Sequence, residues 1–180
     1  MELAESLEFW IAQGVAIIIC ILTSLSYFYK KKTSYLLTQF VVNLLYCIQY
    51  VLLGAIPAAV NNMIALVKYI VFYKSAKENK KNPVWQVILF SIISLVCGLI
   101  VLDSIDGLVP VVTTLMFTYA VWQDNPVILR IVVILCNLLW IMYNFNVKAY
   151  VSAVYSLIEL IISLITLIML VKKSKEKLKD

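Results

Sequence analysis

The chain has 180 residues, of which 63% are hydrophobic, with a mean hydropathy of +0.97 and a formal net charge of +5. A soluble domain of this length cannot bury so much apolar surface in one core, so the composition excludes a soluble globular protein and indicates one that lies in a bilayer. We attribute the positive charge to attraction by anionic lipid headgroups and expect no nucleic-acid partner.

Apolar stretches that are long enough to cross a bilayer follow one another along the whole chain. A spanning helix needs about 20 mostly apolar residues, because every backbone polar group in lipid must find its hydrogen bond within the helix. We predict an all-α membrane protein with seven transmembrane helices, at residues 9–29, 34–53, 58–73, 84–102, 108–122, 127–145 and 149–171. The segment 1–8 contains three glutamates and no basic residue, unlike the start of a signal peptide, so we expect the first helix to be retained.

Basic residues gather on alternate loops of this predicted topology. Thirteen of the fifteen lysines and arginines fall on one side, namely Lys30, Lys31, Lys32, Lys74, Lys77, Lys80, Lys81, Arg130, Lys172, Lys173, Lys175, Lys177 and Lys179. Short cytoplasmic loops retain positive charge. We therefore predict a multi-pass protein of the cell membrane, with segment 1–8 outside the cytoplasm and a basic tail, 172–180, inside it.

The sequence contains an internal repeat with an offset of 94 residues. This shift aligns the segment Asn-Leu-Leu-Tyr at 43–46 with Asn-Leu-Leu-Trp at 137–140, and Ala-Ala-Val at 58–60 with Ser-Ala-Val at 152–154. We predict two parallel three-helix units, 9–73 and 108–171, joined by a linker helix at 84–102. Parallel repeats build several transporter families, in which the binding site lies near the midplane between the halves.

Polar residues in the last predicted helix lie on one stripe. Glu159 is accompanied by Ser152, Ser156, Ser163 and Thr166 at spacings of three and four residues. It lies about 15 Å from either end of the helix, too deep for its short side chain to reach the interface. A charged carboxylate at that depth must be paired, hydrated or protonated.

Two interpretations of Glu159 stay open. It binds a proton or a solute in a cavity, or it is a paired group within a helix-packing stripe of small residues. Its best candidate partner is Lys68, the only basic residue well inside a predicted helix, although the lysine stem can also extend to the cytoplasmic interface.

Amide and aromatic side chains inside other predicted helices complete the candidate site. Aromatic rings beside amides suit a sugar or another flat, hydroxyl-bearing solute, whereas the plain alternative is that the amides bond across helices for stability. The predicted substrate-binding residues are Asn43, Asn61, Asn62, Lys68, Asn137, Trp140, Asn144, Ser156 and Glu159. Pro110 is a candidate gating hinge, or simply a proline tolerated in the first turn of a helix.

Other kinds of chemistry lack the necessary residues. The chain has no histidine, no paired-cysteine spacing and no carboxylate cluster, so we expect no metal and no cofactor. Glu159 is the only deep carboxylate, and no serine has a base within helical reach, so we expect no enzyme activity. All four cysteines, Cys20, Cys47, Cys97 and Cys136, lie in predicted helices, where they act as small hydrophobes.

Several short motifs resemble the YgjV-type bacterial inner-membrane proteins. They are Ile-Ala-Gln-Gly-Val at 11–15, Leu-Leu-Gly-Ala-Ile-Pro-Ala at 52–58, Leu-Val-Pro-Val at 108–111, and the segment 140–144 followed by Glu159. The resemblance covers nearly the whole chain and implies a multi-pass membrane protein whose family function is not established. The helix plan of three, one and three also resembles the SWEET and PQ-loop transporters. The chain departs from them because Gln39 and Gln49 have no preceding proline and Pro110 is the only proline inside a corresponding helix.

We predict a transporter or facilitator for a small polar solute, sugar-like or another polar metabolite, with the lipid bilayer as its other partner. An alternative is a non-transporting scaffold or partner-binding subunit that docks through the loop 74–81 and the basic tail. A protonation sensor based on Glu159 is a third hypothesis. Homo-oligomer formation stays open.

Overall fold

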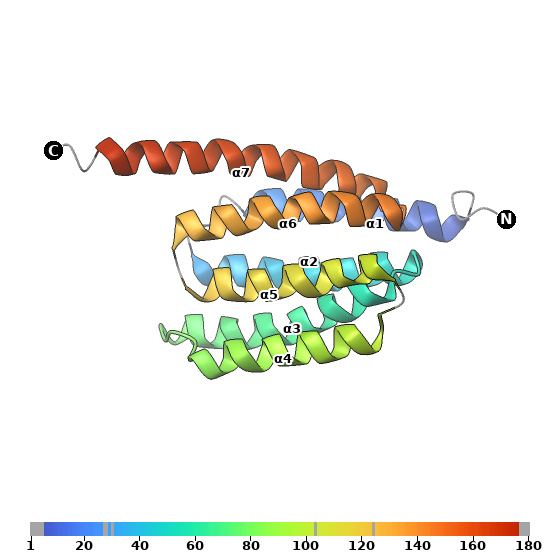
Figure 1. Cartoon of the computed structure of the whole chain (residues 1–180), viewed down its shortest axis with the longest axis horizontal. Helices are drawn as coiled ribbons and strands as arrows, with labels where there is room; N and C mark the ends of the chain where they lie inside the picture. The colour runs from blue at the N-terminus through green and yellow to red at the C-terminus, as the bar shows by residue number, and fades with distance from the viewer. Residues whose placement is uncertain (1–5, 27–28, 30, 103, 124, 177–180) are drawn as a thin grey trace.

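The computed structural model describes residues 6–26, 29, 31–102, 104–123 and 125–176. Within them the chain runs back and forth along one axis in seven α-helices (Figure 1). The helices are α1 (Leu7–Ser26), α2 (Lys32–Leu52), α3 (Ile56–Lys77), α4 (Val84–Ile100), α5 (Leu108–Trp122), α6 (Pro126–Asn146) and α7 (Tyr150–Glu176), with a short 3-10 turn, η2 (Ile105–Gly107), before α5. The predicted all-α membrane fold is confirmed. Most of the predicted segment 1–8 and the last four residues of the predicted tail 172–180 lie outside the described residues.

Six stretches of the described chain are long and apolar enough to cross a membrane. The helix α4 is shorter, with 17 residues, and rises about 25 Å, which is near the lower limit for a span. Because α3 and α5 run in the same direction, α4 has to return the chain from one end of the molecule to the other (Figure 1). α4 also ends two residues earlier than predicted, whereas α3 extends beyond 58–73 at both ends. Pro57 is tolerated in its first turn, and Lys74 and Lys77 interact favourably with its C-terminus.

The repeat is visible in the helix bounds. A shift of 94 residues carries both ends of α2 onto the ends of α6, and the start of α3 onto the start of α7. The connecting turns match as well: Gly54 and Lys148 occupy equivalent positions and both have positive φ, 71° and 59°. After each of them a backbone N–H donates to a carbonyl at 2.8 Å, Ala55 to Tyr50 and Ala149 to Asn144. The two units therefore share their local geometry and run in parallel, as predicted.

Six helices form a closed ring. Within the units, α1 contacts α2 and α2 contacts α3, while α5 contacts α6 and α6 contacts α7; between the units, α3 contacts α5 and α1 contacts α7. The two contacts between units are equivalent under the repeat. The linker α4 lies outside the ring, against α3 and α5.

The linker helix is held by a close approach to the ring. Ser94 Oγ donates to Asn61 Oδ1, and both side chains are buried, at 0% and 2% exposure. One turn further, a Cβ on Gly98 would overlap Val111 Cγ2 on α5. Glycine at position 98 thus lets the backbone of α4 approach α5.

We expect Gly98→Leu to push α4 away from α5 and to lower the free energy of unfolding by about 1–3 kcal/mol, the usual range for an overfilled core. The measurement is the thermal unfolding temperature of the purified protein in detergent. Gly14→Leu is a matched control, because Gly14 also lies inside a helix and a Cβ there meets nothing within 4 Å. Equal unfolding temperatures for the two variants would contradict close packing at Gly98.

Candidate functional site

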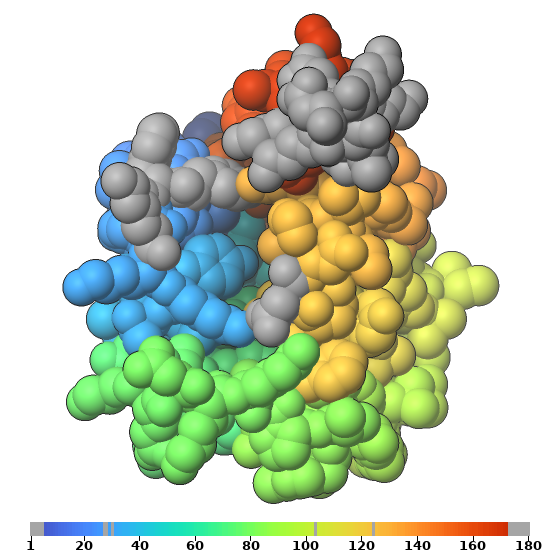
Figure 2. Space-filling model, turned by 90° about the vertical axis from the view of Figure 1, so that its left-hand side faces the viewer, coloured from blue at the N-terminus to red at the C-terminus, as the bar shows by residue number. Residues whose placement is uncertain are grey.

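A cavity of about 480 Å³ lies inside the ring. Lys31, Lys32, Tyr35 and Arg130 line the cavity at the end where α2 and α6 begin. Figure 2 shows the hollow between α2 and α6 at this end. Residues from α1, α2, α3, α5, α6 and α7 contribute to its wall, so both repeat units form it.

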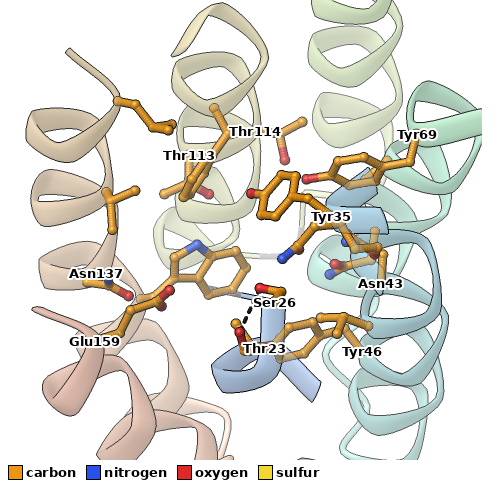
Figure 3. A pocket seen from close by; sticks show the side chains of 18 of the residues that line it. Thr23, Ser26, Tyr35, Asn43, Tyr46, Tyr69, Thr113, Thr114, Asn137 and Glu159 are labelled. Carbon is orange, nitrogen blue, oxygen red and sulfur yellow. Dashed lines mark hydrogen bonds between the residues drawn. The ribbon is translucent and has the colours of Figure 1, made fainter. Parts of the chain in front are cut away.

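The lining of the cavity follows the repeat. Among the described lining residues, eight pairs are related by the offset of 94: Thr23 and Phe117, Tyr35 and Leu129, Gln39 and Val133, Asn43 and Asn137, Tyr46 and Trp140, Tyr50 and Asn144, Asn62 and Ser156, and Ala65 and Glu159. Asn43 and Asn137 thus occupy equivalent places in the two units, and Figure 3 shows them on opposite sides of the chamber. The cavity therefore lies on the axis that relates the two units.

An aromatic layer closes the other end of the cavity. The Tyr50 ring stacks on Tyr46 and on Trp140, with centroids 5.6 and 5.9 Å apart, and meets Tyr143 edge-on at 6.2 Å. Its hydroxyl donates to Asn144 Oδ1 at 2.8 Å. Tyr50 is 1% exposed and Asn144 is 2% exposed. Since Tyr50 and Asn144 are repeat equivalents, this bond crosses the axis between the units.

Further polar contacts join the two units around this layer. Gln13 on α1 donates to the backbone oxygen of Lys148 at 2.9 Å and accepts from the backbone N–H of Val151 at 3.0 Å. Gln49 on α2 and Ser152 on α7 are hydrogen-bonded side chain to side chain, and both are buried. Beyond Tyr143, where α2 and α6 end, lies a smaller hollow of about 190 Å³. The two hollows are thus separated by the aromatic layer.

An ammonium group and a carboxyl group lie on different walls of the cavity. Lys68 on α3 is 3% exposed; its Nζ donates to Thr118 Oγ1 at 3.1 Å and lies 5.4 Å from the centroid of the Tyr69 ring. Glu159 on α7 is partly buried and lines the cavity beside Asn137 (Figure 3). The predicted pairing of Lys68 with Glu159 is wrong, because α3 and α7 are repeat equivalents on opposite sides of the ring.

A family model described as a bacterial inner membrane protein, Imp-YgjV, matches residues 10–174 of the sequence. The chain belongs to this family. Neither the curated proteins nor the solved structures contain a match. Together with its apolar helices, the family match identifies a multi-pass membrane protein of a bacterial inner-membrane family and confirms the resemblance noted in the sequence.

The structure brings most of the predicted binding residues of this Imp-YgjV protein to one cavity. Those that line it are Asn43, Asn62, Lys68, Asn137, Trp140, Asn144, Ser156 and Glu159. Asn61 is the exception, because position 61 faces α4, where the side chain accepts from Ser94 and donates to the Pro57 oxygen at 3.0 Å. Its role is to hold the linker helix. Binding of a solute by the other residues stays a prediction.

Pro110 is the third residue of α5 and lies outside the cavity lining. The helix continues through it to Trp122, and Thr113 Oγ1 donates to the Val109 oxygen at 2.8 Å in the turn that follows. A proline in a first turn removes no helical hydrogen bond. This placement favours the tolerated proline over the hinge, and a role in gating stays a prediction.

Sequence analysis missed part of the cavity wall. Arg130 was counted with the basic residues of one side of the membrane and lies within the predicted helix 127–145, but it was not among the predicted binding residues; in the structure it lies inside α6, which begins at Pro126, and lines the cavity. Asn125 caps that helix by accepting from the backbone N–H of Val127 at 2.9 Å. Arg130 precedes Asn137 by two helical turns, so the two side chains share one face of α6. Tyr69, Thr113 and Thr114 also line the cavity, and no periodic pattern identified them.

Proposed function

We propose that this protein is a transporter or facilitator for a small polar solute, such as a sugar or another polar metabolite, and that the two repeat units rock against each other around the central cavity. The observation that carries the proposal is a chamber with a partly polar lining within the ring of helices, which is hollow to the surface at one end (Figure 2) and bounded at the other by the aromatic layer. Polar side chains are expensive within the membrane, so a chamber lined by them favours a binding role. Parallel repeats with a site between them support the same conclusion.

We further propose that the end of the cavity where α2 and α6 begin faces the cytoplasm, since the lysine-rich loops lie at that end. In a background in which alanine replaces the four cysteines, we expect Ile105→Cys to react with a membrane-impermeant maleimide in intact cells. Lys80→Cys, at the opposite end, should react only after permeabilisation. Both residues are well exposed, at 82% for Ile105 and 73% for the Lys80 side chain, so access to the reagent differs only by side. Reversed labelling would contradict the proposed orientation.

The test of the proposed function is solute uptake by liposomes that contain the purified protein. A panel of radiolabelled sugars, polyols, amino acids and organic acids should include at least one solute that enters faster than it enters empty liposomes. Ala65→Trp should reduce that uptake to background, because Ala65 is 6% exposed and the larger ring would fill the chamber. Val67→Trp is its matched control: Val67 lies on the same helix and is 56% exposed on its outer face.

The result that counts against transport is equal uptake with and without protein across the whole panel. That result would favour the alternative, a non-transporting scaffold. The scaffold hypothesis is tested by whether a partner protein co-purifies in mild detergent. Uptake that survives Ala65→Trp would show that the solute takes another route.

A further inference from the structure

Lys68 is a buried cation whose contacts among the described residues are with neutral groups. Its Nζ donates to the hydroxyl of Thr118 and lies over the ring of Tyr69. No carboxylate of the described chain lies in contact with it. An ammonium has three N–H donors, and the Thr118 hydroxyl accepts one. The side chain lines the cavity, so its remaining donors are available to a molecule bound there.

The fold does not require a lysine at this place. The repeat equivalent of Lys68 is Ile162, which is 42% exposed on the outside of the ring. The related helix thus has an apolar side chain at the equivalent position, and only on α3 does this position line the cavity. A buried charge without an opposite charge is expensive, and replacement by an apolar group of similar shape is often neutral or stabilising. Stability alone therefore gives no reason to keep the ammonium.

Other donors and charges of the cavity favour an anion. Asn137 is 4% exposed, lines the cavity, and its Nδ2 has no hydrogen-bond partner among the described residues. Four basic residues and one acidic residue line the described cavity, namely Lys31, Lys32, Lys68, Arg130 and Glu159. A cavity wall with an excess of positive charge concentrates anions from the cytoplasmic side.

We propose that Lys68 binds a carboxylate group of the transported solute. This inference rests on the proposed function of the cavity and narrows its solute from polar molecules in general to those that bear a carboxylate. The Thr118 hydroxyl positions the ammonium, and the cavity around it accommodates the rest of the solute. Organic acids and amino acids both carry the required group.

The experiment compares charged solutes with neutral ones of the same shape. Radiolabelled lactate, succinate and alanine are tested for binding to the protein in nanodiscs and for uptake into liposomes, with lactamide and succinamide as uncharged competitors and glucose as a neutral solute. We expect at least one carboxylate to bind and to enter, and the amides to compete poorly. Lys68→Met should weaken its binding at least about tenfold, the loss expected for one charged hydrogen bond, and Lys68→Arg should restore part of it.

Lys77→Met is the matched control, because it removes the same charge from an exposed place on the same helix, outside the cavity. Its binding and uptake should equal those of the unaltered protein. Uptake restricted to glucose, or carboxylate binding that is equal in Lys68→Met and the unaltered protein, would overturn the proposal. Carboxylate binding that depends on Lys68 without any uptake would keep the assignment of Lys68 and refute transport. If no carboxylate binds, the assignment fails whatever the uptake of other solutes.

Discussion

Replacing Tyr50 with alanine is expected to make the protein leaky. The ring of Tyr50 lies between Tyr46 and Trp140 and meets Tyr143, so its removal takes out the centre of the layer that separates the main cavity from the hollow beyond. With both hollows connected, small polar solutes should cross without any rocking of the two units. Efflux of preloaded solute from liposomes should then be fast and should lack saturation.

A milder substitution distinguishes the effect of the Tyr50 ring from that of its hydrogen bond. Tyr50→Phe keeps the aromatic layer and loses the bond from the hydroxyl to Asn144, which is 2.8 Å long and buried. Such a bond contributes about 1 kcal/mol, so the balance between the closed and open forms of this end should shift about fivefold. We expect altered transport kinetics without a leak.

Tyr119→Ala is the matched control for both variants. Tyr119 is 50% exposed on the outer face of α5, so its loss leaves the layer intact. Because truncation of a large core side chain costs about 3–5 kcal/mol, a single symmetric peak in size-exclusion chromatography must accompany each leak measurement. A folded Tyr50→Ala protein that retains solute as well as Tyr119→Ala does would refute the closure by this aromatic layer.

The architecture could be predicted from the sequence because the patterns that indicate it extend over many residues. Each helix extends over about four or more turns of mostly apolar residues, and an offset of 94 residues is constant along two whole helices, so small errors at the ends do not matter. Four polar or aromatic residues of α2, spaced by three and four positions, also line the cavity, because so many polar or aromatic groups on one face of a helix cannot all face lipid; they are Gln39, Asn43, Tyr46 and Tyr50.

It was harder to predict which of two adjacent residues on a helix faces the cavity. Asn61 and Asn62 differ by about 100° around α3. Asn62 lines the cavity, whereas Asn61 faces α4. The rotation of α3 is set by contacts such as Ser94 with Asn61, which join residues from different helices. Periodicity within α3 gives no information about them, since α3 is in contact with neighbours on several sides. For the same reason the partner of Lys68, Thr118 on α5, could not be predicted.

Replacing Glu159 with glutamine is expected to uncouple transport from a proton gradient. Glu159 is the only carboxylate among the described residues that line the cavity, and its repeat equivalent is Ala65, so one unit alone can hold a proton there. A gradient of one pH unit stores about 1.4 kcal/mol for each proton, which supports about tenfold accumulation of a solute carried with one proton. Glutamine keeps the shape and the hydrogen-bonding capacity of the carboxyl group but cannot exchange a proton.

The variant should therefore still equilibrate solute down its own gradient while losing the accumulation. The measurement is the ratio of inside to outside concentration in liposomes with an acidic exterior. Glu78→Gln is the matched control: Glu78 is exposed in the loop after α3 and pairs only at the surface, with Lys80 at 2.8 Å, so it should accumulate solute as the unaltered protein does. Equal accumulation by Glu159→Gln would show that the carboxyl group moves no proton, and loss of downhill uptake as well would assign Glu159 to solute binding or to the packing of α7.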